Sequence, residues 1–299
     1  MANTIPAGLQ NNIISQSALE AFSKKLAPLQ AFSTSFNDEA TRRGDTINVT
    51  TLSNTSDAAD FTGTYTAQDV TYGTTAIAID QHKFVTWHVT DTQVAESSAV
   101  ELERFGYQKG SDLADAVFQN ILAEVTVANY GLAAGFDGAA STFDGDDVAD
   151  LRQDMVDYNC PPDQCALVLS NAYYTALLKD GDISGYFDYG SADIIREGRI
   201  PSLFGIGYIF ETGSIPGNSE NLIGFIAHPS AMAVAMRYLE PTNTQEYIAA
   251  NRLYDEASGM VLGYREFYEP STGTQTAVLE AVFGKKVAIS NNLRRMISA

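Results

Sequence analysis

Histidines, cysteines and clustered aspartates are the side chains of this sequence that could bind a metal ion. His82 and His88 stand six residues apart in a segment with strand-like alternation, so both would lie on one face of a strand. No third ligand follows at a suitable spacing, and hydrogen-bonded strand histidines are the simpler interpretation. Cys160 and Cys165 are too far apart for a Cys-x-x-Cys knuckle, and the run 144–147 lacks the closing Glu of a calcium loop. We therefore predict a proline turn between the cysteines, a helix cap at 144–147, no metal site and no cofactor.

Nucleophilic and phosphate-binding chemistry has equally few candidates. The segment 217–221 (Gly-Asn-Ser-Glu-Asn) lacks the second glycine of a nucleophile elbow and is typical of a turn. Neither 205–207 (Gly-Ile-Gly) nor 284–286 (Gly-Lys-Lys) has the remaining residues of a phosphate loop. The segment 228–230 (His-Pro-Ser) places a histidine beside a serine, but helix initiation after a strand explains it without a catalytic partner. We predict that the chain is not an enzyme.

Composition excludes several classes of function. The chain has 299 residues, with 37 acidic and 18 basic side chains and a net charge of −19. Such a charge repels phosphate backbones, so we expect no basic face that reads nucleic acid. Hydrophobic residues make up 45% of the chain, enough for a core of ordinary size, and no apolar run approaches the ~20 residues that span a bilayer. The first residues lack a signal-peptide pattern, and two cysteines do not make a disulfide framework, so we expect a soluble protein of a reducing compartment.

The charge is unevenly distributed along the chain. Residues 1–50 carry four basic and four acidic side chains, and residues 281–299 carry four basic and no acidic ones. The ends thus contribute 0 and +4, and the 230 residues between them carry −23. The ends and the body therefore differ in electrostatic character.

The N-terminal third divides into a polar arm and a strand-rich segment. Residues 1–43 show helical spacing of apolar side chains only around 19–26, which predicts an extended arm with one short helix. From Gly44 onward, period-2 alternation at 47–50 and again at 85–90 predicts two strands, separated by a stretch rich in Thr, Asp and Gly. We expect a long β-hairpin whose returning arm covers roughly residues 75–90.

A long amphipathic helix is predicted next. Ser98 and Glu101 form a capping-box pattern, and Gly131 is placed to end the helix. Apolar residues recur at helical spacing: Leu113, Val117, Phe118, Ile121, Leu122 and Val125. A continuous helix over 98–130 would be roughly 48 Å long at ~1.5 Å per residue, although Gly106 and Gly110 could bend or divide it.

The remainder alternates between helices and strands. We predict helices over 147–158 and after Ser170, and a short helix after His228. The expected strands lie at 166–169, 222–227, 261–269 and 276–283, with a turn at Gly284 into a last strand at 286–289. The body is therefore α+β.

The order and spacing of these segments resemble the major capsid proteins of tailed bacteriophages, which have the Hong Kong 97 type of shell fold. The resemblance covers nearly the whole chain and includes the segments 167–174, 203–210 followed by 214–216, 225–233, 260–269 and 281–289. It implies an N-terminal arm over 1–43 and an extended hairpin loop over 44–92. It also implies a peripheral domain from 93–140 and 256–299 with a spine helix at 98–130, and an axial domain over 141–255.

The sequence departs from some members of that family in two ways. The arm begins almost directly after Met1 without a helical, charged scaffolding region, which implies a separate scaffolding protein or removal of such a region. Some members crosslink a loop lysine to an asparagine of a neighbouring subunit. No lysine occurs between Gly44 and His82, and Lys83 lies near the predicted base, so we do not expect that chemistry.

The resemblance implies a subunit that assembles as pentamers and hexamers into an icosahedral head around double-stranded phage DNA, with assembly in the host cytoplasm. Implied partners are a portal, a separate scaffolding protein and a cement or decoration protein; the DNA would be enclosed without sequence-specific binding, and no membrane is involved. The alternatives are an encapsulin-like compartment that holds protein cargo, a phage tail or adhesion protein, and an α+β hydrolase.

Two sets of residues carry the contact hypotheses. We expect the hairpin to be anchored on an adjacent subunit by Phe61, Tyr65 and Tyr72. We also expect Lys24, Lys25, Arg42, Arg43, Arg294 and Arg295 to lie near the interior or at joints between subunits. Solvation of the chain ends, or pairing with nearby acidic residues, is the alternative for the basic set.

Overall fold

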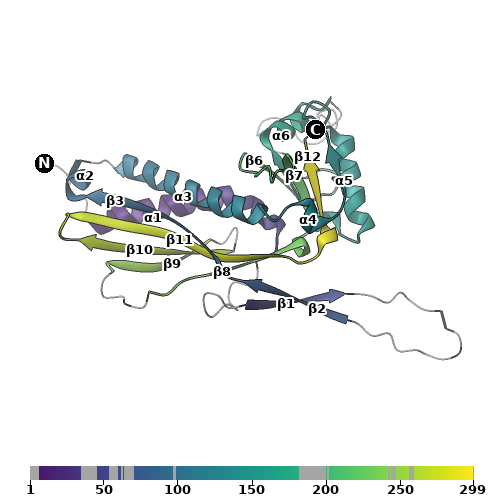
Figure 1. The fold of residues 1–299 in the computed structure, drawn as a ribbon. Helices are drawn as coiled ribbons and strands as arrows, with labels where there is room; N and C mark the ends of the chain where they lie inside the picture. Colours follow the sequence, from purple (N-terminus) through teal and green to yellow (C-terminus); the bar gives the residue numbers. More distant parts are fainter. Residues whose placement is uncertain are drawn as a thin grey trace.

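The protein combines a long sheet, a second sheet at one end of it and a projecting hairpin (Figure 1). The computed structural model describes residues 7–34, 46–53, 60–61, 63, 71–96, 99–181, 200, 202–241, 243, 247–255 and 259–298. Within these ranges each of the two main sheets has five strands, so the α+β class expected from the sequence is correct. Across the same ranges no helix is both long and apolar enough to cross a membrane.

The long sheet is antiparallel and is built around its longest strand, β11. Its strands are β3 (Gln81–Thr90), β11 (Thr274–Val287), β10 (Met260–Glu269), β9 (Ala249–Asp255) and β8 (Met232–Arg237). β11 pairs with β3 over its first part and with β8 from Val282 to Val287. The expected turn at Gly284 is therefore wrong: β11 continues through this glycine, and the last strand is β12 (Leu293–Ile297).

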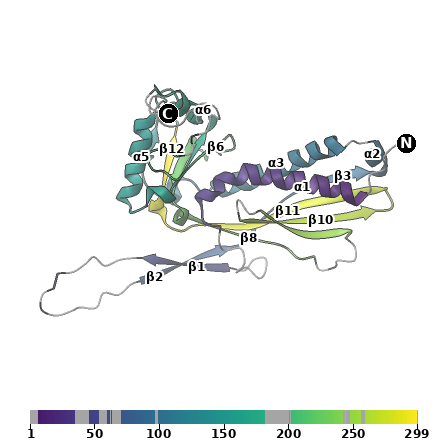
Figure 2. The ribbon, with the colours of Figure 1, turned by 180° about the vertical axis from the view of Figure 1, so that it is seen from behind.

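Two helices lie side by side on one face of the long sheet, as both views show (Figures 1 and 2). They are α1 (Ala7–Leu26) and α3 (Ala99–Leu122). A Cβ at Gly110 would lie 2.0 Å from the carbonyl oxygen of Ala18, so only glycine permits this approach of α3 to α1. The described part of the arm is thus a 20-residue helix, followed by the 3-10 turn η1 (Ala27–Ala31), and the expected extended arm with one short helix is wrong there.

The long helix expected over 98–130 is divided. α3 runs through Gly106 and Gly110 without a break but ends at Leu122, and α4 (Val127–Tyr130) follows after a turn. The residue before α4, Thr126, has an extended backbone (φ −133°, ψ 161°) that no continuous helix can include. Gly131 ends α4 in the left-handed conformation (φ +46°), as predicted. Ser98 lies outside the described residues, so its capping box does too.

The second sheet is mixed and has helices on one face. Its strand order is β4 (Phe136–Asp137), β12, β7 (Leu222–Ala227), β5 (Ala166–Ser170) and β6 (Tyr208–Thr212). Two helices cover it, α5 (Gly145–Asp157) and α6 (Asn171–Lys179). Asp144 caps α5 in a capping box with Asp147, so the predicted cap is confirmed. Within the described residues, further short elements are α2 (Asp91–Glu96), η2 (Pro162–Gln164), η3 (Pro229–Ala231) and η5 (Ser290–Asn292).

The strands of each sheet come from both sides of the boundaries drawn from the sequence. β12 lies within 256–299 but pairs with β7 of the second sheet. β8 and β9 lie within 141–255 but belong to the long sheet. The chain therefore crosses between the sheets more often than a division at 141 and 255 implies.

Alternation along β5 and β7 divides the apolar core into two layers. Val168 and Phe225 face a cluster that continues under α1, α3 and the long sheet, whereas Leu167 and Ile226 face α5 and α6. Phe32, just after η1, stacks on Phe225 with ring centroids 5.5 Å apart. One continuous core therefore joins the long sheet to the second sheet.

The hairpin consists of β1 (Thr46–Ser53) and β2 (Thr71–Ala78), paired from Thr46↔Ala78 to Ser53↔Thr71. The strands predicted at 47–50 and 85–90 exist and form parts of β1 and β3. The returning arm of the hairpin, expected over 75–90, is wrong beyond Ala78. The chain leaves the hairpin there, and β3 pairs with β11 because Trp87 packs into the main core.

Candidate functional site

The hairpin is attached to the body through a small apolar cluster at its base. Ile47, Ile77 and Ile79 are buried against Ala235 of β8 and Val282 of β11. A Cβ at Gly284 would lie 2.2 Å from the carbonyl oxygen of Ala78, so β2 crosses β11 in direct backbone contact. Beyond this crossing the β1–β2 ribbon lies apart from both main sheets (Figures 1 and 2).

The three aromatic residues expected to anchor the hairpin are described to different extents. Phe61 is 63% exposed. The backbone of Tyr72 lies in β2 opposite Leu52, and Tyr65 lies outside the described residues. Phe61 lies between β1 and β2 in the sequence, and it remains a prediction that a neighbouring subunit contacts its ring.

Further exposed aromatic residues, which the sequence did not single out, lie on the long sheet. Phe84 on β3 is 61% exposed and Tyr254 on β9 is 54% exposed. The strand register places both on the face turned away from α1 and α3. Alternation within each strand predicts that every second side chain shares a face, but only the tertiary structure shows which face lies away from α1 and α3.

The two described basic residues of the N-terminal segment, Lys24 and Lys25, are paired with acids of the same chain. Lys24 Nζ lies 2.7 Å from a carboxylate oxygen of Glu20, which raises the pKa of this exposed lysine through the hydrogen bond. Lys25 pairs with Asp115 of α3. Arg42 and Arg43 lie outside the described residues. The two lysines therefore do not form a separate cationic patch.

The two C-terminal arginines are buried within the second sheet. Arg294 is 6% exposed, has its Nε 3.3 Å from Asp154 Oδ2 and stacks on the ring of Tyr158. Arg295 is 5% exposed and pairs with Glu220. Removing one partner of a buried ion pair is destabilising, so we expect neutralisation of either arginine to weaken the subunit before it tests any contact with DNA.

The histidines and cysteines occupy structural positions. His82 Nε2 lies 3.0 Å from the Glu280 carboxylate, and His88 Nδ1 lies 2.9 Å from the Thr276 hydroxyl. Both cysteines are free and buried, and burial raises the pKa of Cys165 to about 12. Within the described ranges no group of three or more His, Cys, Asp or Glu side chains could hold a metal ion.

The close serine–histidine pair of the sequence is a turn. His228 Nδ1 lies 2.7 Å from Ser230 Oγ and accepts from the Ser230 amide, while Nε2 lies 3.1 Å from Gln164 Oε1. Burial lowers the pKa of His228. The imidazole caps η3, as the predicted short helix after His228 requires, and its second nitrogen contacts a neutral amide instead of a carboxylate.

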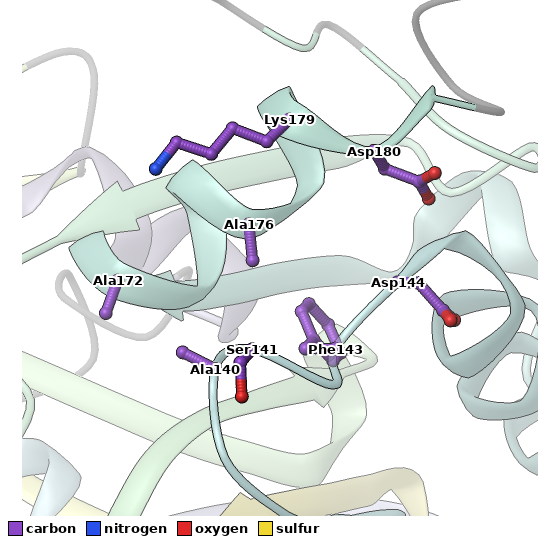
Figure 3. A pocket seen from close by; sticks show the side chains of 8 residues that line it. All are labelled: Ala140, Ser141, Phe143, Asp144, Ala172, Ala176, Lys179 and Asp180. Atoms are coloured by element: carbon purple, nitrogen blue, oxygen red, sulfur yellow. The ribbon is translucent and has the colours of Figure 1, made fainter.

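A surface pocket of about 430 Å³ lies between α6 and the loop before α5 (Figure 3). Its apolar lining includes Phe143 and small residues of α6, and its charged residues are Asp144, Lys179 and Asp180. Asp144 caps α5, and Asp180 accepts from the amide of Gly145 at 2.8 Å. Lys179 points away from Asp180 in Figure 3. The carboxylates thus hold the first turn of α5, and no acid–base pair converges on the pocket.

Known proteins resemble this chain in structure and not in sequence. No family model and no curated protein matches the sequence. The fold is similar to a solved structure of Mycobacterium phage Che8 (16% identity, TM-score 0.60, 89% of each chain covered). It is also similar to the capsid structure of the cyanophage P-SCSP1u (15% identity, TM-score 0.60, 91% of this chain and 86% of that chain). The chain has the fold of phage capsid proteins.

A virus-like particle from Pyrococcus furiosus has the same fold. It is 12% identical with a TM-score of 0.55, and the match covers 95% of this chain and 98% of that one. The likeness to a capsid fold expected from the sequence is therefore confirmed, and it extends over both sheets, because each match covers at least 89% of this chain.

Proposed function

We propose that this chain is the major capsid protein of a tailed bacteriophage and assembles into the icosahedral head that encloses the double-stranded DNA genome. The observation that carries the proposal is the phage capsid fold over about nine-tenths of the chain. Pentamers and hexamers of this chain would form the shell in the host cytoplasm. A portal, a separate scaffolding protein and a cement or decoration protein would complete the virion.

The division into a body and an arm supports this proposal. A closed shell needs subunits of defined shape that also reach their neighbours. The continuous core under α1 and α3 supplies the shape, and the β1–β2 ribbon with exposed Phe61 supplies the reach. Many weak contacts of this kind stabilise a shell far beyond any single pair of subunits. In the Hong Kong 97 description, α3 would be the spine helix, and the part of 141–255 that forms the second sheet and its helices would belong to the axial domain.

The charge distribution supports enclosure of DNA without tight binding. The net charge is −19, and Lys24, Lys25, Arg294 and Arg295 each have an acidic partner in the same chain. A subunit of this net charge, in which these four cations are paired with acids, attracts the phosphate backbone weakly.

The hairpin test replaces residues 54–70 with an Asn-Gly turn. Ser53 and Thr71 are cross-strand partners, so a two-residue type I′ turn can close the shortened ribbon. We expect this variant to remain folded and to lose assembly in size-exclusion chromatography and electron microscopy. Phe61→Ala should weaken assembly, and Phe61→Tyr should largely retain it because the ring remains. Normal shells from the shortened variant would contradict the role of the hairpin.

An encapsulin-like compartment is the second candidate, favoured by the likeness to the Pyrococcus furiosus virus-like particle. The contents of purified particles distinguish the two: the ratio of absorbance at 260 and 280 nm and nuclease treatment report DNA, and gel electrophoresis reports a protein cargo. The α+β hydrolase, proposed from the sequence as a different class, receives no support from the pocket beside α6, whose carboxylates bind backbone amides.

A further inference from the structure

The turn at 217–221 has an unusual backbone. Asn218, Ser219 and Asn221 all have left-handed φ angles, of 49°, 59° and 52°. Residues with a Cβ rarely adopt this conformation, and a cluster of them persists only where surrounding contacts hold it in place. The segment 217–221 lacks the sequence of a nucleophile elbow, so contacts with the rest of the protein must hold its strained backbone.

Asn218 binds the end of α3. Its Nδ2 donates to the carbonyl oxygens of Leu122 and Val125, each at 2.8 Å. The last carbonyls of a helix have no partner within the helix, so a side chain from elsewhere can satisfy them. Asn218 lies just before β7, and it therefore ties the end of α3 to the second sheet.

Glu220 binds the start of α4 on the other side of the same break. The amide of Val127 donates to both carboxylate oxygens, at 2.8 and 3.1 Å. The carboxylate also pairs with buried Arg295 of β12, whose Nη2 donates to the carbonyl of Leu132 at 3.1 Å. A negative charge at the N-terminus of a helix is favourable, and here it is held by the second sheet.

The long sheet holds the break from the opposite side. Lys285 of β11 donates to the carbonyl of Asn120, and its Nζ lies 3.4 Å from Glu124 Oε1. α3 has no basic residue in its own last turn, so Lys285 supplies the favourable charge from another strand. Residues 120–127 are thus bound by two side chains of the turn before β7, Asn218 and Glu220, and by Lys285 of the long sheet.

We propose that the turn 217–221 is a latch that fixes the angle between α3 and the second sheet. α3 ends beside α4 at the foot of the second sheet (Figure 1), so a change at this break would tilt one sheet relative to the other. The inference rests on the proposed function in one respect: in a shell, this angle would set the curvature at which subunits meet. Its local part, the restraint on residues 120–132, does not depend on assembly.

The test compares three variants of the monomeric protein by hydrogen–deuterium exchange. Asn218→Ala removes the cap on α3, and Glu220→Ala removes the cap on α4 and the partner of Arg295. Ser219→Ala is the matched control, because it lies in the same turn, is exposed and keeps both caps. We expect at least tenfold faster exchange across 120–132 in the first two variants and unchanged exchange in the control. Faster exchange at Val127 alone, or equal exchange in all three variants, would overturn the latch.

A second measurement covers the effect on assembly. Glu220→Gln keeps an acceptor for Val127 but loses the charge that faces Arg295, and it guards against a Glu220→Ala variant that fails to fold. We expect particles of Asn218→Ala and Glu220→Gln to show a broader range of diameters than the wild type in electron microscopy. Diameters as uniform as those of the wild type, with faster exchange, would overturn the role in curvature. If the wild type forms no particles, the proposed function fails, and the exchange experiment still decides on the latch.

Discussion

The hairpin and the junction between the two sheets are attached to the same body by very different means. At the junction, α3 and the second sheet share a continuous core. Asn218 and Glu220 bind the end of α3 and the start of α4 from the second sheet, and Lys285 binds the end of α3 from the long sheet. The hairpin has a small isoleucine cluster at its base and one backbone crossing at Gly284. The difference shows how one chain can keep a fixed shape and still extend an arm. The buried core and the side-chain hydrogen bonds are concentrated at the junction of the sheets, whereas the hairpin has few contacts with its own subunit.

Phe225→Ala should have the largest effect, because it removes a fully buried ring from the junction. Phe225 is 0% exposed and stacks on Phe32. Loss of such a ring costs about 3–5 kcal/mol of unfolding free energy. We expect a single cooperative denaturant transition at a lower midpoint, measured by circular dichroism and tryptophan fluorescence. A loss below about 1 kcal/mol would contradict the shared core.

Ile77→Ala tests the hairpin base with a comparable deletion of buried atoms. Ile77 is 0% exposed, and an isoleucine truncation in a core costs about 2–5 kcal/mol. Because its cluster is small, we expect a value near 2 kcal/mol and proteolysis concentrated between residues 46 and 78. If Ile77→Ala lowers the free energy of unfolding as much as Phe225→Ala does, the hairpin base contributes as much to stability as the junction, contrary to our account.

Gly284→Ala tests the crossing of hairpin and sheet. The added Cβ would meet the Ala78 carbonyl, so the strands must shift, and overpacking of this kind costs about 1–3 kcal/mol. Gly181→Ala is the matched control, since nothing lies within 4 Å of a Cβ there. We expect a lower melting temperature for Gly284→Ala than for Gly181→Ala. Equal melting temperatures would show that β2 and β11 accommodate the added Cβ without strain.

The smallest expected effect is a difference in thiol reactivity between the buried cysteines of the second sheet and a cysteine introduced at position 61. Burial raises the pKa of Cys160, and that of Cys165 to about 12, so at pH 8 both side chains remain protonated and little reactive thiolate is present. We expect a disulfide reagent to modify them only on unfolding, whereas an added Phe61→Cys thiol should react at once. Rapid reaction of the native cysteines in the folded wild-type protein would contradict the closed core of the second sheet.

Local patterns predicted the elements of this fold better than their pairing. The alternation at Val85, Trp87 and Val89 identified a strand, but only the burial of Trp87 explains why it joins β11 and leaves the hairpin. The helix α1 was underestimated because its contact with α3 depends on small residues, Ala18 against Gly110, and small residues give a weak apolar stripe.

The sequence proposed contact residues by their type, and the structure shows where some of these residues lie. The sequence suggested Phe61, Tyr65 and Tyr72 as residues that contact a neighbouring subunit. Phe61 is exposed, and its contact with a neighbour stays a prediction. The basic residues Arg294 and Arg295 look like a charged tail in the sequence, but β12 carries them into the second sheet, where they pair with acids distant in the chain. Glu220 and Lys285 also bind partners that are distant in the sequence, so local patterns could not predict their roles.

Electron microscopy of the purified protein tests the capsid assignment most directly. The chain should form closed shells of uniform diameter at high protein concentration, with each hairpin lying over a neighbouring subunit. A protein that stays monomeric at every concentration and ionic strength, with no shells or tubes, would contradict the account.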